Sequence, residues 1–198
     1  MKTISLEKSS LAAMTLAVFS FALIIGGWVH ISRAEEAPQR IVELAHAQLA
    51  KWGKNPVIIR AVKAQNGKNR TLAQIKAMDK RWRKTPGIAD YMEKMMESEC
   101  GQFLRKVQET APFYSEIFVM DNQGANVAMT DKTTDYWQGD EAKFKKSYNM
   151  GKGAVFVDRV EFDDSSQAYL VQVSVPVEEN GRVIGTITFG IDVDQVEE

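Results

Sequence analysis

The chain has 198 residues, of which 44% are apolar and 26% are charged, and 25 basic side chains nearly balance 26 acidic ones. This composition is typical of a globular protein, and the length excludes a large multidomain enzyme. A single cysteine excludes an intrachain disulfide and a cysteine-based zinc site. The net charge conceals two opposed blocks: residues 51–84 carry 11 basic and 1 acidic side chains, whereas residues 157–198 carry 2 and 10.

Residues 1–34 contain a long apolar run, Leu11–Ile31, without acidic, lysine or arginine side chains. A helix of this length rises about 31 Å, enough to cross the hydrocarbon core of a bilayer. Lys2 and Lys8 precede the run, and this bias places the N-terminus in the cytoplasm. The segment is expected to be a transmembrane anchor or a signal peptide, and the sequence leaves both open. Either way, residues 35–198 are expected to face the periplasm, anchored to the inner membrane or secreted.

Residues 35–112 show apolar side chains at helical spacing and form an expected helical lead. The expected helices cover 38–62 with an interruption at 53–56, 71–84, and 88–110. Four apolar positions of the first segment leave two alternatives open, because they suit either pairing with a second copy in a homodimer or packing on the protein's own sheet. These positions are Ile41, Leu44, Leu49 and Trp52.

Residues 113–198 change to the two-residue apolar period of β-strands. Strands are expected over 116–120, 126–129, 154–162, 168–177 and 183–193, with one helix over 140–149. Asn180-Gly181 is a strong hairpin signal between the last two strands. The expected fold class is therefore α+β, with an antiparallel sheet of about five strands and helices packed on it.

The order of these elements resembles the extracytoplasmic Cache sensor family, also called PDC, whose fold is a PAS-like sheet with a long N-terminal helix. The similarity covers roughly residues 36–195, and its most specific stretches are YSEIFVMDNQGANVAMTDKTTDYWQGDE and VQVSVPVEENGRVIGTITFGIDVDQV. The resemblance implies a small extracellular ligand, held between the sheet and the loop and helix that cross it. It also implies signalling through a membrane protein. Because no output domain or second spanning run follows, a separate histidine kinase or chemoreceptor is the expected partner.

The loop before the last helix carries four candidate ligand-binding residues, Tyr136, Trp137, Gln138 and Asp140. Small-molecule pockets combine aromatic walls with a few fixed polar groups, and this loop offers both. The alternative is that the two aromatic rings cover the sheet and that Asp140 caps the helix.

Phe162 and Asp163, at the end of the third strand, are the other candidate ligand-binding residues. The resemblance implies that Asp163 would hold the ammonium of an amino acid, and a plain turn residue is the alternative. Amino-acid-binding members also clamp the carboxylate with an arginine, but residues 106–158 contain none. Lys143 or Lys152 would have to replace it as a less directional charge.

The remaining charged and reactive groups each have a plain structural alternative. The basic block suits anionic lipid head groups or an acidic partner as well as a solvated helical surface, and nucleic acid is not an expected partner. Cys100 is expected to be buried in a helix, with a redox role as the alternative. Carboxylate oxygens suit divalent cations, so a cation sensor is a further alternative. Its candidate residues are Asp158, Glu161, Asp163, Asp164, Glu178 and Glu179.

The two histidines, His30 and His46, lie far in sequence from any candidate nucleophile. Without a nucleophile, base and orienting group there is no catalytic set, so neither an enzyme nor a cofactor is expected. The sequence favours a small-ligand sensing module that acts through a separate membrane partner. The alternatives are a ligand-free accessory protein of a membrane receptor and the divalent-cation sensor.

Overall fold

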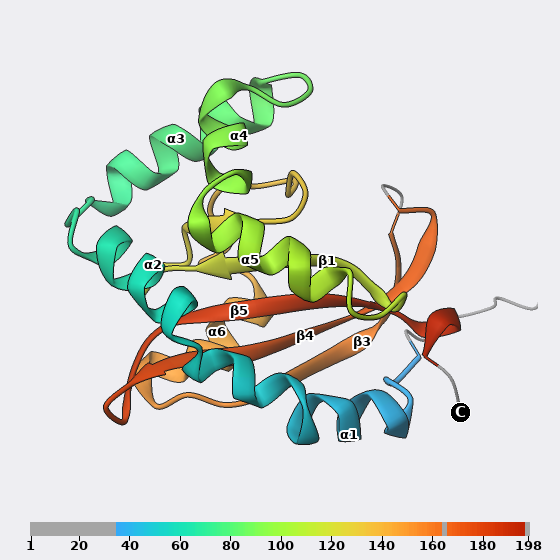
Figure 1. Cartoon of the computed structure of the whole chain (residues 1–198). Helices are drawn as coiled ribbons and strands as arrows, with labels where there is room; N and C mark the ends of the chain where they lie inside the picture. The colour runs from blue at the N-terminus through green and yellow to red at the C-terminus, as the bar shows by residue number, and fades with distance from the viewer. Residues whose placement is uncertain (1–34, 164–165, 197–198) are drawn as a thin grey trace, which may run out of the picture. The chain divides into compact units, whose positions relative to one another are not determined.

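One antiparallel sheet of five strands, in the order β2-β1-β5-β4-β3, organises the computed structural model of the chain (Figure 1). The strands are β1 Tyr114–Met120, β2 Asn126–Met129, β3 Phe156–Asp163, β4 Ala168–Glu179 and β5 Arg182–Asp192. Every expected strand is present, with ends within two residues of the expected ones. Asn180 and Gly181 turn between β4 and β5 with φ of 49° and 76°, as a two-residue hairpin turn requires. The expected α+β class is confirmed.

The structure describes residues 35–163 and 166–196. The expected anchor or signal segment, Leu11–Ile31, lies outside these residues. Of the helices in the described ranges, none combines the length and the apolar character that crossing a membrane would need.

The helical lead contains more breaks than the apolar pattern indicates. Its elements are α1 Gln39–Ala47, the 3-10 helix η1 Leu49–Lys54, α2 Pro56–Asn66, α3 Leu72–Lys84, α4 Asp90–Met96 and α5 Glu99–Gln108. The expected helix over 88–110 is wrong as a single element, because Ser98 starts a new helix by accepting a hydrogen bond from the Gly101 N–H at 3.0 Å. Thr71 caps α3 as expected and forms a capping box with Gln74.

The first face of the sheet packs against α1, η1, α2 and α5 in the larger hydrophobic core. Val171, Val173 and Val175 of β4 point into this core, as their alternation predicts. Ile41, Leu44 and Leu49 are buried there too, so packing on the protein's own sheet is the arrangement observed. The other core residues on this face include Ile58, Val62, Leu104, Ile117, Phe189 and Ile191.

Cys100 lies in the same core and is 3% exposed. Burial, with the negative charge of Glu99 as a smaller cause, raises the pKa of its thiol to about 12. A thiol in this environment is protonated and inert at neutral pH, which favours the structural role over the redox alternative.

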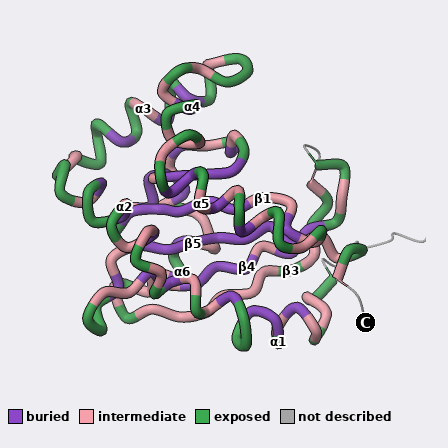
Figure 2. The backbone as a smooth tube through the Cα atoms, in the orientation of Figure 1, coloured by how far each residue is buried: buried purple, intermediate pink, exposed green. Residues whose placement is uncertain are grey.

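The second face of the sheet is covered by α3, the loop over 130–141 and the helix α6 Ala142–Tyr148. Phe118, Met120, Trp82, Tyr136 and Phe144 form the centre of this smaller core. Figure 2 shows burial concentrated along β1, β5 and β4, whereas much of α3 and α4 is exposed. The loop and α6 therefore cover a sheet face that carries polar as well as apolar side chains.

Candidate functional site

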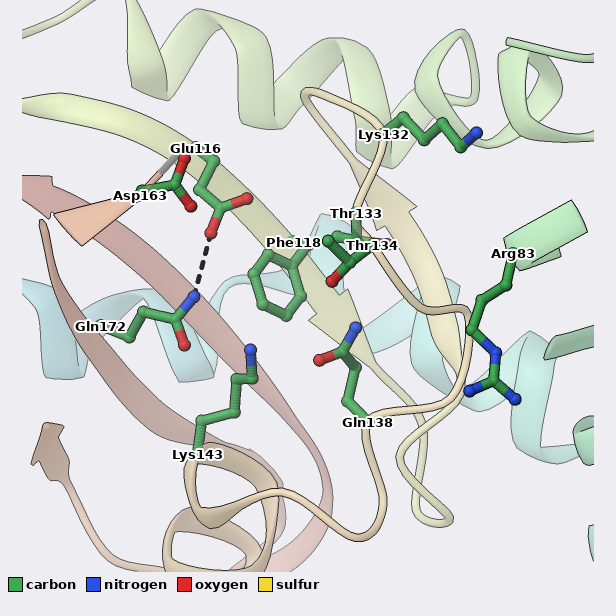
Figure 3. Close-up of a pocket in the computed structure, with 10 residues that line it drawn as sticks. All are labelled: Arg83, Glu116, Phe118, Lys132, Thr133, Thr134, Gln138, Lys143, Asp163 and Gln172. Atoms are coloured by element: carbon green, nitrogen blue, oxygen red, sulfur yellow. Dashed lines mark hydrogen bonds between the residues drawn. The ribbon is translucent and has the colours of Figure 1, made fainter. Parts of the chain in front are cut away.

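A pocket of about 320 Å³ opens between this second face of the sheet, the 130–141 loop and α6 (Figure 3). The sheet supplies Glu116, Phe118, Asp163 and Gln172, and α3 supplies Arg83. The loop and α6 supply the opposite wall, which consists of Lys132, Thr133, Thr134, Gln138 and Lys143.

The floor of the pocket is built by a row of three residues across the sheet. Glu116 of β1 pairs with Gly190 of β5, and Gly190 pairs with Gln172 of β4. A Cβ atom at position 190 would lie 2.6 Å from Glu116 Cγ, so the absence of a side chain there lets Glu116 extend across β5. Glu116 Oε1 then accepts a hydrogen bond from Gln172 Nε2 at 3.1 Å. This places a carboxylate on the floor.

The position of Glu116 makes its ionised form costly. Burial is the main cause that raises the pKa of its carboxyl group, and the negative charges of Asp163 and Asp131 raise it further. Lys143 and the hydrogen bond from Gln172 act in the opposite direction. Glu116 is not among the site residues predicted from the sequence. The sequence does contain a signal for this residue. Glu116 is an acidic side chain in β1, on the face opposite to that of the buried Ile117 and Val119.

Each cationic group that lines the pocket already has an acceptor. Arg83 contacts the carboxylates of Asp79 at 2.9 Å and Asp135 at 3.5 Å. Lys143 pairs with Glu141 at 2.9 Å.

Lys132 Nζ, the third cation, donates to the carbonyl oxygens of Thr85 and Gly87, both at 2.8 Å. Arg83 is the arginine among the lining residues, and it comes from the preceding helix α3 and not from residues 106–158. Two lysines were expected to replace a carboxylate-binding arginine. Lys143 lines the pocket, whereas Lys152 is exposed and is not among the residues that line it.

Gln138 is the predicted site residue most deeply placed in the pocket wall, at 1% exposure. Its Nε2 donates to the Asp135 carbonyl at 2.8 Å. Its Oε1 is buried and has no hydrogen-bond partner among the described residues. Figure 3 shows this carboxamide facing Phe118 and Lys143, so a buried acceptor is directed into the pocket.

Tyr136 and Trp137 do not line the pocket. Tyr136 is 1% exposed, and its hydroxyl accepts hydrogen bonds from Gln65 and Arg70 at 3.1 and 3.0 Å. The indole N–H of Trp137 donates to the Gln123 carbonyl at 2.8 Å. Both aromatic side chains therefore cover the sheet, which was the alternative to the predicted wall.

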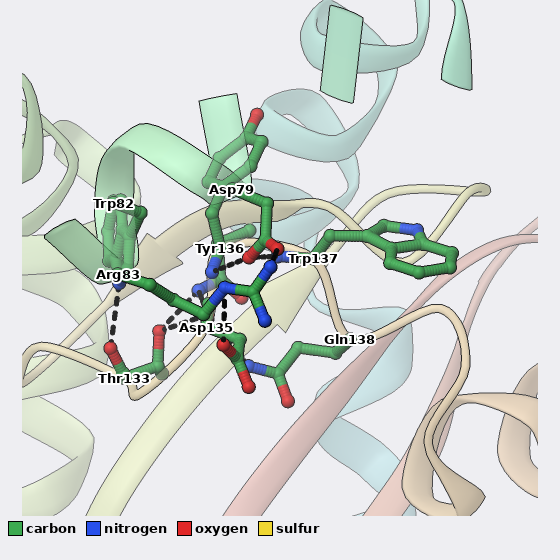
Figure 4. A network of polar contacts seen from close by, with 9 residues as sticks. Asp79, Trp82, Arg83, Thr133, Asp135, Tyr136, Trp137 and Gln138 are labelled. Atoms are coloured by element: carbon green, nitrogen blue, oxygen red, sulfur yellow. Dashed lines mark hydrogen bonds and ion pairs between the residues drawn. The ribbon is translucent and has the colours of Figure 1, made fainter. Parts of the chain in front are cut away.

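Asp79 of α3 fixes the loop on which these aromatic residues lie (Figure 4). Asp79 is 5% exposed, and its Oδ1 accepts hydrogen bonds from the backbone N–H groups of Tyr136 at 3.0 Å and Trp137 at 3.2 Å. Its Oδ2 pairs with Arg83. One buried carboxylate thus connects α3 to the loop and to an arginine that lines the pocket.

The three remaining predicted residues differ in their placement. Asp140 is exposed, does not line the pocket and does not cap α6, which begins after Glu141 without a side-chain cap. Phe162 is 49% exposed and lines a neighbouring pocket of about 340 Å³. Asp163 lines both pockets, and its Oδ1 accepts hydrogen bonds from the backbone and hydroxyl of Ser166 at 2.8 and 3.1 Å. Asp163 thus combines the turn role with a place in the pocket.

Of the acidic residues considered for a divalent cation, Asp164 lies outside the described residues, and Asp158, Glu161 and Asp163 line the neighbouring pocket of about 340 Å³. In the ranges that the structure describes, no three acidic, histidine or cysteine side chains converge on a metal site. Glu178 and Glu179 pair with Lys54 and Lys63 at 3.8 and 2.7 Å. These glutamates neutralise the basic block at the β4–β5 hairpin.

No family model matches the chain, and the search of curated proteins found no match. The chain is similar in structure to the sensor domain of the V. cholerae histidine kinase DctB, with 15% identity over 79% of this chain and 52% of that chain, at a TM-score of 0.43. It is also similar to the sensory domain of the Campylobacter jejuni chemoreceptor Tlp3, with 14% identity over 78% of this chain and 62% of that chain, at a TM-score of 0.40. The third such structure is the ligand-binding domain of the Pseudomonas aeruginosa PAO1 chemoreceptor PctC, with 10% identity over 77% of this chain and 62% of that chain, at a TM-score of 0.35.

The chain spans only about half to three fifths of the length of these sensor domains. At TM-scores below 0.5 the likeness does not extend to function.

Proposed function

We propose that this protein is an extracytoplasmic sensing module that binds a small polar molecule in the pocket of Figure 3 and acts through a separate membrane protein, a histidine kinase or a chemoreceptor. The observation that carries the proposal is Gln138 Oε1, a buried acceptor without a partner that faces the pocket. A buried polar group without a hydrogen bond costs about 1–3 kcal/mol, and a ligand donor would remove that cost. The helical lead and five-stranded sheet expected of Cache sensors agree with the proposal.

The chemistry of the lining favours binding over catalysis. The pocket holds charged groups, amides, hydroxyls and one aromatic ring, and its described residues include no histidine or cysteine. The Thr133 hydroxyl donates to the carbonyl of Asp135 at 2.7 Å, so its proton is directed at a backbone acceptor and not at a base. The arrangement can orient and desolvate a ligand, which is what a binding module requires.

The contacts around Gln138 also supply a physical route by which a bound molecule would be reported. Gln138 donates to the carbonyl of Asp135, and the Asp135 carboxylate contacts Arg83. Arg83 and Asp79 belong to α3, and Asp79 holds the backbone of the loop. A ligand that moves Gln138 therefore changes the contacts between the loop and α3.

The test is a thermal-shift screen of the full chain in detergent against amines, amino acids, carboxylates and purines. A ligand that binds only the native state raises the melting temperature. We expect Gln138→Ala and Thr134→Val, at two points of the wall, to reduce the shift. Gln39→Ala, an exposed glutamine of α1, is the matched control and should leave the shift unchanged. No shift with any compound, or a shift that persists in both pocket variants, would refute the proposal.

A further inference from the structure

Starting from the proposed function, we infer that the pocket selects a ligand with an organic cation, an amine or a guanidine, and that Glu116 is the residue that binds this cation. Glu116 lies on the floor of the pocket, across Gly190, with its carboxylate oriented by Gln172. The amide of Gln172 comes from β4, which is separated from β1 by β5.

The charges in the lining of the pocket are not balanced at Glu116. Arg83, Lys132 and Lys143 each have carboxylate or carbonyl acceptors of their own. Glu116 forms no ion pair with any described residue, and the hydrogen bond that it accepts comes from the neutral amide of Gln172. Lys143 acts on Glu116 only at longer range, because its ammonium pairs with Glu141. A half-buried carboxylate without an ion pair of its own is costly, and a ligand cation would compensate it.

The wall opposite Glu116 carries a second acceptor. Gln138 Oε1 is a buried acceptor without a partner, and it lines the same pocket. Figure 3 shows Glu116 and Gln138 on either side of the Phe118 ring. Two acceptors that face one space require a ligand with several N–H donors, which ammonium and guanidinium groups have and carboxylates lack.

Phe118 adds a third feature of the same chemistry. Lys143 Nζ already lies 5.5 Å from the centroid of the Phe118 ring, at the edge of the space between Glu116 and Gln138. A cation near an aromatic face is attracted by its π-electrons, more strongly where water is excluded. The Phe118 ring is therefore a more favourable neighbour for an organic cation than for an anion.

Binding of a cation at Glu116 is coupled to the ionisation of this residue. The charged groups that act on Glu116 are Lys143 of α6, Asp163 of β3 and Asp131 of the loop, and Gln172 of β4 is neutral. Burial raises the pKa of Glu116, so the empty pocket retains a proton at pH values where an exposed glutamate has lost it. A bound cation favours the ionised form and releases that proton. Affinity for a cation should therefore fall as the pH decreases from neutral.

The experiment is isothermal titration calorimetry on the full chain in detergent at pH 7 and pH 5, with agmatine and putrescine as cationic probes. Succinate and succinamide are the anionic and neutral probes of similar size. We expect the cations to bind and the other two to bind at least about tenfold more weakly. Glu116→Gln keeps the shape of the side chain but removes its charge, and should weaken cation binding about 30-fold or more and abolish its pH dependence.

The matched control is Glu109→Gln, an exposed glutamate at the end of α5, which should change neither affinity nor pH dependence. If succinate or succinamide binds at the pocket and the cations do not, the inference is overturned and the proposed function stands. The inference is also overturned if Glu116→Gln binds the cations as tightly as the unaltered protein. If none of the four probes binds and the wider screen gives no shift, the inference and the proposed function fail together.

Discussion

At the scale of single residues, Gly190 determines where the carboxylate of Glu116 lies. Strand side chains on one face of a sheet normally stand beside each other, and a residue with a side chain at 190 would block the path from β1 to β4. Glycine weakens a strand interior, and here it permits a contact between residues on strands that are not neighbours. The function proposed for Glu116 therefore depends on Gly190, which has no side chain and leaves room for that of Glu116.

Gly190→Ala should destabilise the protein by about 1–2 kcal/mol, because the new methyl group would overlap Glu116 Cγ. In a Glu116→Ala background the overlap is absent, and the cost should fall to about zero. The measurement is urea unfolding of the two single variants and the double variant as a double-mutant cycle. Equal costs of Gly190→Ala in both backgrounds would contradict the contact between these two residues.

The pKa of Glu116 also predicts how the stability of the empty protein depends on pH. The pKa is raised in the folded state, so between the ordinary value of 4.5 and the raised value the native state binds more protons than the unfolded chain. The free energy of unfolding therefore decreases as the pH rises through this range. The Glu116→Gln variant has no carboxyl group at this position and does not lose this free energy of unfolding. It should therefore be more stable than the unaltered protein at pH 7, with a smaller difference at pH 4.

Urea unfolding of both proteins at several pH values measures this difference. Asp121 and Asp135 also have raised pKa values, mainly through burial, and contribute the same slope to both proteins. Their contributions cancel in the comparison. A Glu116→Gln variant that is less stable than the unaltered protein at pH 7 would show that the ionised carboxylate is stabilising.

At the scale of secondary structure elements, α3 controls the position of the 130–141 loop. The loop has few backbone hydrogen bonds to strands, and Asp79 replaces them by accepting two of its backbone N–H groups. Trp82, one turn later on α3, donates its indole N–H to the carbonyl of Thr133 at 2.7 Å. Two buried side chains of one helix thus hold both halves of the loop that forms the pocket wall.

Asp79→Ala should therefore destabilise the protein by about 2–4 kcal/mol, because two buried N–H groups lose their acceptor. The loss of the Asp79–Arg83 pair contributes less, since the Arg83 side chain is 57% exposed. Asp79→Asn retains an oxygen acceptor and should cost less than half as much. Thermal unfolding and amide hydrogen exchange at residues 136 and 137 measure both effects. Unchanged exchange at these two amides in Asp79→Ala would contradict the role of Asp79.

At the scale of the whole molecule, the two charge blocks of the sequence meet in space. Lys54 and Lys63 of the basic block contact Glu178 and Glu179 of the acidic block. Arg60 pairs with Glu99 of α5 at 2.6 Å. These pairs are largely exposed and contribute little to stability individually. Other basic side chains of the block stay exposed and take part in none of these ion pairs; they are Lys51, Lys68, Lys76, Lys80, Arg81 and Lys84.

The sequence by itself determined the elements whose cause is local. The alternation of Val171, Val173 and Val175 predicts which side of β4 is buried, and Asn180-Gly181 predicts the final hairpin. These predictions succeed because side-chain period and turn conformation depend on a few neighbouring residues. The break at Ser98 was missed, because the apolar spacing continues across it while the chain changes direction.

Only the tertiary structure decided which residues surround the pocket. Glu116 and Gln172 lie 56 residues apart, and Arg83 comes from a helix that precedes the sheet. Tyr136, with the aromatic character expected of a pocket wall, is instead held in the core by Gln65 and Arg70. The physical reason is that strand order and register place distant residues side by side, and no local preference specifies either.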